Sequence, residues 1–382
     1  MQKKYFSLWI TQAWYQGNPL LTLLRPLSLL FGCLSAYRKK RLLPAAWLPP
    51  VPTIVVGNIT VGGTGKTPAV IYLAKQLQDR GLQPVILSRG YGGHYEDCTL
   101  VRPGDSANKV GDEALLLQQQ TGAAVVVGRN RVDAAQYALN HIPAQPATFC
   151  RDPRVLLCDD GLQHYRLGRH IEIAVIDAAR AFGNRKLLPE GPLREPVSRL
   201  AEVDLILVHG DQARLPMSDP SGVQADRIFS MRTIPERFYP AGANSVHGSR
   251  DKVRKAQPEY AAGLTVQQFQ QRLGCNLKVV AATGNPSRFF ISLQQLGFQL
   301  DVYEFPDHHP LESSEIMTIQ HSKHTHLPVV MTSKDAVKCQ NWSLHNVWYL
   351  DITTELEEGF MQKLIDRIQE QHTHMRLSHT PA

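Results

Sequence analysis

The sequence predicts an α/β fold in which helices cover both faces of a parallel β-sheet and a phosphate-binding loop follows the first strand. Two observations carry this prediction. Short, continuously apolar runs, as expected for strands buried on both faces, alternate with segments of helical spacing. A glycine-rich turn joins the first of these runs to the first helix. With 382 residues, the chain is also long enough for two domains.

The first strand is predicted over Thr53–Asn58, and helical spacing runs from Ala69 to Leu77. Between them lies the loop Thr60-Val61-Gly62-Gly63-Thr64-Gly65-Lys66-Thr67. Backbone N–H groups of such a loop bind phosphate oxygens, Lys66 adds a full positive charge, and the Thr67 hydroxyl suits Mg²⁺. Thr60 stands where the usual G-x-x-x-x-G-K-[ST] pattern has glycine, and the pair Gly62-Gly63 can supply the flexibility instead. The segment therefore predicts a domain of the P-loop NTPase type.

The remaining strands of this sheet are predicted at Pro84–Ser88, Ala123–Gly128, Arg154–Asp160, Glu172–Asp177 and Asp204–Val208. Ligands of parallel α/β sheets bind beyond the carboxyl ends of the strands. Asp159 and Asp160 lie at such an end, where a carboxylate beside a phosphate loop positions Mg²⁺. The alternative is a turn that caps the strand, with Gly161 supplying the bend.

Composition is typical of a globular enzyme, with 43% hydrophobic and 20% charged residues. The six cysteines form no C-x-x-C pair and show no metal-ligand spacing, which indicates a reducing, cytoplasmic setting. The net charge of +7 favours an anionic partner, which leaves nucleic acid, a membrane surface or a phosphorylated substrate open.

The N-terminal segment favours a membrane surface among these anionic partners. A leucine-rich run over Leu20–Tyr37 precedes the basic cluster 38–41, and Arg25-Pro26 interrupts it, which disfavours a spanning helix. An apolar face beside a basic cluster predicts an interfacial helix, and Trp9, Trp14 and Tyr15 are residue types that favour a bilayer interface. In the alternative, the leucines pack on the protein's own core.

Three further motifs are ambiguous when taken alone. Asp112 and Glu113 open a predicted helix, where acidic residues are ordinarily caps. Asp307-His308 follows a proline and is either a base with its orienting partner or a surface turn. The histidines 321, 324 and 326 lie in a polar segment without a matching ligand cluster, which favours a solvated loop over a metal site.

Together the motifs resemble the tetraacyldisaccharide 4'-kinases, or lipid A 4'-kinases, of the Gram-negative envelope pathway. The matching segments are Val56–Pro68, Ser88–Gly92, Gly111–Glu113, Asp159–His164, Leu193–Pro196, Gly284–Phe290 and Phe305–His309. Their order and spacing cover nearly the whole chain. Glu190 stands where the family is expected to have alanine, and Ser333 where it is expected to have glutamate.

The resemblance implies transfer of the ATP γ-phosphoryl group to the 4'-hydroxyl of tetraacyldisaccharide 1-phosphate, which gives lipid IVA. The implied partners are this anionic glycolipid and the inner-membrane surface, with peripheral attachment at the cytoplasmic face. Neither nucleic acid nor an obligatory protein partner is expected. The expected organisation is an interfacial helical segment over 1–41, a P-loop kinase domain over 42–225, a smaller α/β domain over 226–350, and a C-terminal helix and tail over 351–382.

The resemblance also implies roles for single residues. The loop from Thr60 to Thr67 holds the ATP phosphates, and Thr67 with Asp159 or Asp160 holds Mg²⁺. Asp112 takes the proton from the sugar hydroxyl, supported from the second domain by His308, which Asp307 orients. Arg194 stabilises transition-state charge, Arg129 binds substrate phosphate, and Gln163 and His164 line the acceptor or nucleotide site. Two alternatives remain, a soluble P-loop NTPase of the switch or metallochaperone type and a non-catalytic protein that binds the lipid precursor. The first would need an N-K-x-D motif, of which Thr332–Asp335 is a partial echo.

Overall fold

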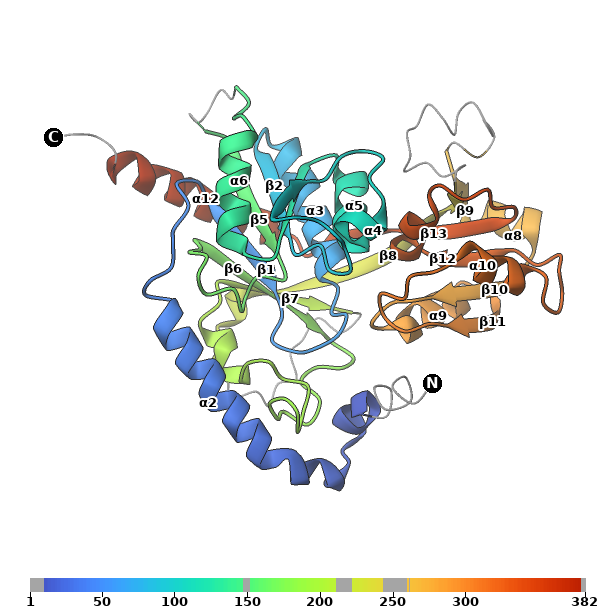
Figure 1. Cartoon of the computed structure of the whole chain (residues 1–382), viewed down its shortest axis with the longest axis horizontal. Helices are drawn as coiled ribbons and strands as arrows, with labels where there is room; N and C mark the ends of the chain where they lie inside the picture. The colour runs from blue at the N-terminus through green and yellow to red at the C-terminus, as the bar shows by residue number, and fades with distance from the viewer. Residues whose placement is uncertain (1–9, 147–151, 211–221, 243–259, 261, 379–382) are drawn as a thin grey trace. The chain divides into compact units, whose positions relative to one another are not determined.

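The computed structural model describes residues 10–146, 152–210, 222–242, 260 and 262–378, so Trp9 and Cys150 lie outside the described residues. The chain divides into two compact units. Unit 1 comprises Met1–Arg89, Gly128–Thr233 and Thr354–Ala382, and unit 2 comprises Gly90–Val127 and Ile234–Thr353. Figure 1 labels the elements of both units.

Unit 1 is built on a parallel sheet. Its strands are β1 (Thr53–Gly57), β2 (Gln83–Ser88), β5 (Arg154–Asp159), β6 (Ile171–Asp177), β7 (Leu205–His209) and the first part of β8 (Ile228–Pro240). They lie in the order β2-β5-β1-β6-β7-β8, and every neighbouring pair is parallel. All residues of β1, β6 and β7 are buried, as continuous apolar runs predict. The predicted parallel sheet is confirmed, with strand ends displaced by one residue at most.

Helices cover this sheet. α3 (Lys66–Asp79) packs against β1, β2 and β5, and α6 (Arg131–His141) packs against β2. The C-terminal helix α12 (Phe360–Ser378) places Phe360 edge-on against Phe229 of β8, with ring centroids 5.2 Å apart. Short 3₁₀ turns, η2 (Val197–Ala201) and η3 (Ala225–Arg227), complete the connections. The apolar spacing of the first helix is confirmed, because the buried residues of α3 are Ala69, Val70, Leu73, Ala74 and Leu77.

In unit 2, four parallel strands lie in the order β11-β10-β12-β13. The strands are β10 (Asn276–Ala281), β11 (Gln299–Glu304), β12 (Val329–Thr332) and β13 (Val347–Leu356), while β9 (Leu264–Thr265) pairs antiparallel with β8. One face packs on α10 (Ser313–Gln320), and the other packs on α8 (Val266–Leu273) and α9 (Pro286–Gln295). Two short turns, α11 (Ser333–Ala336) and η7 (Val337–Cys339), follow β12. The expected second α/β domain is therefore present.

The segment Gly90–Val127 belongs to unit 2, although the sequence placed it within a kinase domain over 42–225. It carries β3 (Cys98–Leu100), α4 (Ala107–Val110), α5 (Asp112–Thr121) and the start of β4 (Ala124–Gly128). Its polar side chains bind the rest of unit 2, because Gln119 donates to Gln340 at 2.7 Å and Gln120 donates to Asp351 at 3.0 Å. Asp112 and His308, expected in different domains, consequently share one unit.

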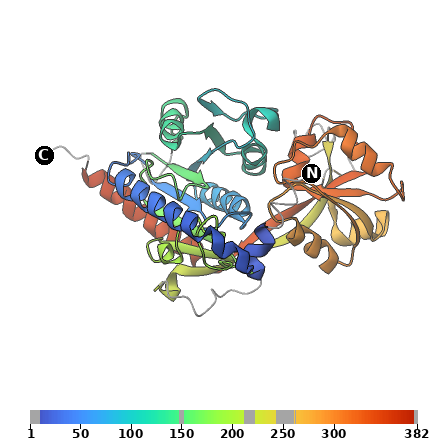
Figure 2. The same cartoon turned by 60° about the horizontal axis from the view of Figure 1, so that its bottom comes forward.

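The N-terminal leucine-rich run forms η1 (Pro19–Leu24) and α2 (Arg25–Leu42), and the helix changes from 3₁₀ to α where Arg25-Pro26 interrupts the run. Among the described residues, Pro19–Leu42 is the one helical stretch long and apolar enough to cross a membrane, and 11% of its most apolar window is buried. In Figures 1 and 2, α2 lies along the outside of unit 1. Large apolar side chains of η1 and α2 are turned outward: Leu20, Leu23, Leu27, Leu29, Leu30, Leu34 and Tyr37 are 55–79% exposed. The alternative in which these leucines pack on the core is therefore wrong.

The polar side of α2 holds it to unit 1. Ser28 Oγ donates to the Leu187 carbonyl at 2.8 Å, Lys39 pairs with Glu202, and Arg25 donates to Glu190 at 3.1 and 3.3 Å. Glu190 is 5% exposed, so the acidic residue that departs from the family pattern is a buried partner for Arg25. The helix is thus polar toward the protein and apolar toward solvent.

Trp14 differs from its expected place at a bilayer interface. It is 8% exposed and packs with Ala13 and Leu21, and its indole N–H donates to the Pro189 carbonyl at 3.0 Å. The indole therefore finds both its apolar contact and its hydrogen bond inside the protein.

Candidate active site

The phosphate loop is shaped by the end of β7. Gly65 precedes α3 with φ +99°, and a Cβ atom there would lie 2.1 Å from Nδ1 of His209, so the site accepts only glycine. His209 is buried, its Nδ1–H donates to the Thr64 carbonyl at 3.0 Å, and its Nε2 accepts from the Thr233 hydroxyl at 3.1 Å. No sequence motif pointed to His209, although its hydrogen bond to Thr64 holds the loop immediately before Lys66.

A second segment fixes the other half of the loop. Residues 192–194 run antiparallel to residues 59–61: Val61 N–H donates to the Pro192 carbonyl at 2.9 Å, and Arg194 N–H donates to the Ile59 carbonyl at 2.7 Å. This pairing places the Arg194 backbone beside the phosphate loop, although the two are more than 130 positions apart in the sequence.

Asp160 joins the two cations of this region. Lys66 Nζ lies 3.4 Å from Asp160 Oδ1, and Arg194 Nη1 lies 3.2–3.3 Å from both carboxylate oxygens. Burial by itself raises the pKa of Asp160, but the charges of Lys66 and Arg194 outweigh it and hold that pKa well below its usual range. The structure therefore brings together the expected loop lysine, strand-end aspartate and arginine.

Asp159 is held more deeply than Asp160. It is 3% exposed, and its carbonyl accepts from Nη2 of the buried Arg131 at 3.0 Å. Asp160 has φ +49°, a conformation that turns the chain sharply at the strand end. The adjacent aspartates thus have different surroundings, and Asp160 faces the phosphate loop.

Gln163, His164 and Arg129, which were predicted to contact the acceptor or the nucleotide, have different surroundings from one another. Gln163 Nε2 donates to the Asn58 carbonyl at 3.1 Å and to Glu195 at 2.6 Å, so its amide nitrogen already serves the protein. Burial and the neighbouring Arg131 charge lower the pKa of His164 to about 4, which makes its imidazole neutral at pH 7. Arg129 is exposed directly after β4.

The acid–histidine pair lies in unit 2. His308 Nδ1 is 3.1 Å from both carboxylate oxygens of Asp112. Because an ionised carboxylate only accepts hydrogen bonds, this nitrogen carries the proton. Asp112 is the first residue of α5 and is 5% exposed, and the Tyr91 ring lies 4.6 Å from the His308 ring. Two residues separated by 196 positions therefore form one hydrogen-bonded pair.

Two lysines surround this pair. Lys334 Nζ lies 3.0 Å from Glu113 Oε1, 3.4 Å from Asp307 Oδ1 and 3.5 Å from His308 Nε2. Lys338 Nζ lies 3.6 Å from Asp112 Oδ2 and 2.9 Å from Asp335, whose carboxylate is buried. Lys334 and Lys338 are four positions apart, and this spacing was the available sequence signal. In the sequence analysis the segment was considered only as a partial match to the nucleotide-specificity motif N-K-x-D.

The pKa values of Asp112 and His308 are both shifted from their usual values. Burial of Asp112 raises its pKa, but the hydrogen bond from His308 and the charges of Lys334 and Lys338 outweigh burial and lower it to about 2. Burial lowers the pKa of His308, and the hydrogen bond to Asp112 raises it to a net value above normal. A buried carboxylate with a strongly lowered pKa, hydrogen-bonded to a histidine, is typical of functional sites.

For metal binding, the described residues contain no group of three or more His, Cys, Asp or Glu side chains with suitable geometry. His321, His324 and His326 are exposed, and His321 Nδ1–H donates to the Met317 carbonyl. Thr67 and Asp160 offer hydroxyl and carboxylate oxygens beside the phosphate loop. Such hard donors suit Mg²⁺, which proteins commonly hold through one or two side chains together with substrate phosphates.

Comparisons with known proteins show the family of this chain. The family described as tetraacyldisaccharide-1-P 4'-kinase, LpxK, matches residues 20–369. The chain belongs to this family. Tetraacyldisaccharide 4'-kinases of Shewanella sp. strain MR-4 and Shewanella piezotolerans are 40% and 38% identical over 94% and 95% of this chain and 95% and 97% of their own lengths. The protein is accordingly a phosphotransferase of lipid A biosynthesis.

A solved structure has the same fold. Aquifex aeolicus LpxK, crystallised with ATP, superposes with a TM-score of 0.67 over 91% of this chain and 99% of its own, at 24% identity. The sequence-based assignment of family, fold and kinase activity is confirmed.

Proposed function

We propose that this kinase uses Mg·ATP and that unit 1 holds the nucleotide. Lys66 and amides of the loop Thr60–Thr67 bind the β- and γ-phosphates, since that loop leads into the N-terminus of α3, where an α-helix favours bound anions. Thr67 and Asp160 would hold Mg²⁺, which would supply positive charge to neutralise the phosphates of ATP. The observation that carries this assignment is the Lys66–Asp160–Arg194 contact at the loop.

Arg194 then stabilises the charge that develops on the transferred phosphoryl group. Its guanidinium is bound to Asp160, so it is preorganised at the loop and needs little reorganisation during the reaction. Asp159 supports this arrangement from beneath, through the Arg131 contact to its carbonyl.

Asp112 acts on the acceptor hydroxyl. With a pKa of about 2, its carboxylate is ionised at pH 7 and accepts the hydrogen bond of the sugar hydroxyl. A strong base is unnecessary, because phosphoryl transfer passes through a loose transition state in which the hydroxyl proton leaves late. His308 orients Asp112 through its Nδ1–H, and Asp307 and Lys334 fix the other side of the imidazole.

α2 attaches the enzyme to the cytoplasmic face of the inner membrane as a peripheral protein. Its leucines provide an apolar face and residues 38–41 a basic cluster, which together bind an anionic leaflet. The acceptor is itself anchored in that membrane, so the helix raises its local concentration at the enzyme.

The test follows labelled γ-phosphate from Mg·ATP to tetraacyldisaccharide 1-phosphate in detergent micelles. Wild type should form the 4'-phosphorylated lipid, and Lys66→Ala and Asp112→Ala should each lose at least about 100-fold in kcat. Equal turnover in Lys66→Ala would contradict the phosphate-loop assignment. ATP hydrolysis by wild type without lipid product would instead favour a soluble NTPase.

A further inference from the structure

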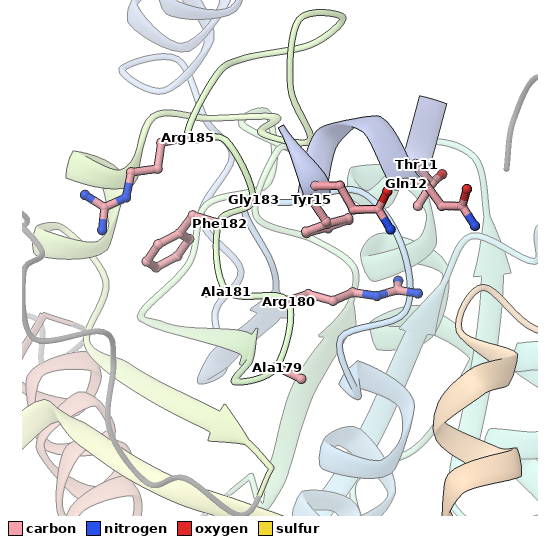
Figure 3. A pocket seen from close by; sticks show the side chains of 10 residues that line it. Thr11, Gln12, Tyr15, Ala179, Arg180, Ala181, Phe182, Gly183 and Arg185 are labelled. Atoms are coloured by element: carbon pink, nitrogen blue, oxygen red, sulfur yellow. The ribbon is translucent and has the colours of Figure 1, made fainter. Parts of the chain in front are cut away.

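A pocket of about 450 Å³ opens in unit 1 between the N-terminal segment before η1 and the turn after β6 (Figure 3). Gln12 and Tyr15 line it from the N-terminal side, and Arg180, Phe182 and Gly183 line it from the turn. Its size lies within the range of small-molecule sites, roughly 300–1,000 Å³. None of the residues assigned above to nucleotide, metal or proton transfer lines it.

Arg180 is the cation of this pocket that reaches the phosphate loop. A Cβ atom at Gly62 would lie 3.4 Å from its Nη1, so the guanidinium lies against the glycine turn. Its Cζ lies 5.6 Å from the centre of the Tyr15 ring, and Figure 3 shows the side chain extending beneath Tyr15. Asp177 accepts from the backbone N–H groups of Ala179 and Arg180 and so fixes the turn.

Within the part of the chain that the structure describes, the Arg180 guanidinium makes this cation–π contact and no ion pair. A cation held in place without a carboxylate partner is available for an anion. Its planar fork matches a phosphate group, with which arginine forms two parallel hydrogen bonds.

The N-terminal segment that lines the pocket also contacts the phosphate loop of the same unit. The N-terminal segment packs Trp14 and Leu21 against Val61 of the loop, and Asn184 N–H donates to the Trp14 carbonyl at 2.9 Å. The same segment continues directly into α2 with its exposed leucines. A ligand in this pocket would contact Arg180, which lies against the phosphate loop, and the segment that leads through η1 to the exposed leucines.

We propose that this pocket binds the phosphorylated glucosamine end of the lipid acceptor, with Arg180 on its phosphomonoester. The acceptor has the matching chemistry, because acyl chains, sugar and phosphate meet in one molecule. This proposal gives the phosphate-binding role to Arg180 in place of Arg129. It depends on the family's acceptor and on no assignment of Asp112 or Lys66.

The experiment measures transfer at saturating Mg·ATP with two acceptors, the tetraacylated disaccharide 1-phosphate and the same disaccharide without its phosphate. Arg180→Met keeps the apolar length of the side chain, Arg180→Lys keeps the charge, and Arg80→Ala changes an exposed arginine at the end of α3 as a control. Arg180→Met should raise KM for the phosphorylated acceptor about 10- to 100-fold, by the loss of a charge-assisted contact. KM for ATP, and KM for the unphosphorylated acceptor, should stay within about twofold, and Arg180→Lys should fall between wild type and Arg180→Met.

Three results would overturn the proposal. The first is an unchanged KM for the phosphorylated acceptor, and the second is an equal loss with both acceptors, which would mean that Arg180 only supports the fold. The third is weaker binding of Arg180→Met to phosphatidylglycerol vesicles without acceptor, which would assign the pocket to bulk phospholipid headgroups. Failure of the proposed catalytic roles would be distinguishable, because it would show as an unchanged kcat in Lys66→Ala and Asp112→Ala.

Discussion

The outward leucines of η1 and α2 lead to a quantitative prediction for membrane binding. Leu23, Leu27 and Leu34 are 79%, 55% and 59% exposed in the protein. Transfer of a fully exposed leucine side chain from water to an apolar phase is worth roughly 2 kcal/mol. Scaled by these exposed fractions, the three side chains contribute about 4 kcal/mol, so replacing all three by serine should lower the partition coefficient on vesicles about 1,000-fold.

The assay is sedimentation with vesicles of mixed phosphatidylethanolamine and phosphatidylglycerol, with kinase activity in detergent micelles measured beside it. Single changes provide a matched pair, since Leu27 is 55% and Leu48 is 54% exposed, and only Leu27 lies on α2. Leu27→Ser should weaken binding about sixfold and Leu48→Ser should leave it unchanged. Full binding of the triple variant, or equal effects of the two single changes, would refute the apolar-face argument.

Three further outcomes follow from the sites. Asp112→Asn should lower kcat about 10²- to 10⁴-fold and lower the pKa of His308, because the hydrogen bond that raises it loses its charged acceptor; an unshifted His308 titration, followed by NMR of histidine-labelled protein, would contradict this. The pKa of His164 is about 4 in the folded protein and 6.5 in the unfolded chain. Because the unfolded chain binds this proton more tightly, the free energy of unfolding is highest above pH 6.5 and falls by about 3 kcal/mol as the pH falls toward 4. The free energy of unfolding of His164→Gln, measured in urea, should therefore depend less on pH between 4 and 6.5 than that of wild type, and the same pH dependence in both proteins would contradict this. His209→Ala leaves the Thr64 carbonyl without its donor, at a cost of about 1–3 kcal/mol, and should raise KM for ATP roughly tenfold; His170→Ala, which loses a hydrogen bond at the start of β1, should not.

The parts of the site that the sequence predicted are contiguous in the chain. Thr60–Thr67 carries its own glycines, lysine and hydroxyl, so the chemistry of the loop can be read without knowing what packs around it. The turn at Asp159 and Asp160 was predictable for the same reason, since it follows a buried strand whose direction the parallel sheet dictates. Which aspartate faces Lys66 was not, because that depends on the φ of Asp160 and on Arg131 from α6.

The groups that hold these motifs in place come from distant segments. His209 reaches the loop from the end of β7, and Lys334 and Lys338 reach Asp112 from the turn after β12. None of these three residues belongs to a recognisable catalytic motif. A side chain that supports a site needs only the right position and a hydrogen bond, and neither leaves a pattern in the sequence. The segment Gly90–Val127 groups with unit 2 for a related reason, since glutamine side chains on α5 bind partners more than 200 residues later.

By itself, the sequence determined the parallel α/β fold, the phosphate loop, the strand-end carboxylates and a leucine-rich helix with a basic end. Local backbone preference and hydrophobic periodicity suffice for these features. Only the tertiary structure decided which side of that helix faces outward, that Glu190 is the buried partner of Arg25, and that Lys334 and Lys338 surround the pair of Asp112 and His308. Side-chain direction and ionisation depend on neighbours that folding brings from far along the chain, so no local pattern contains them.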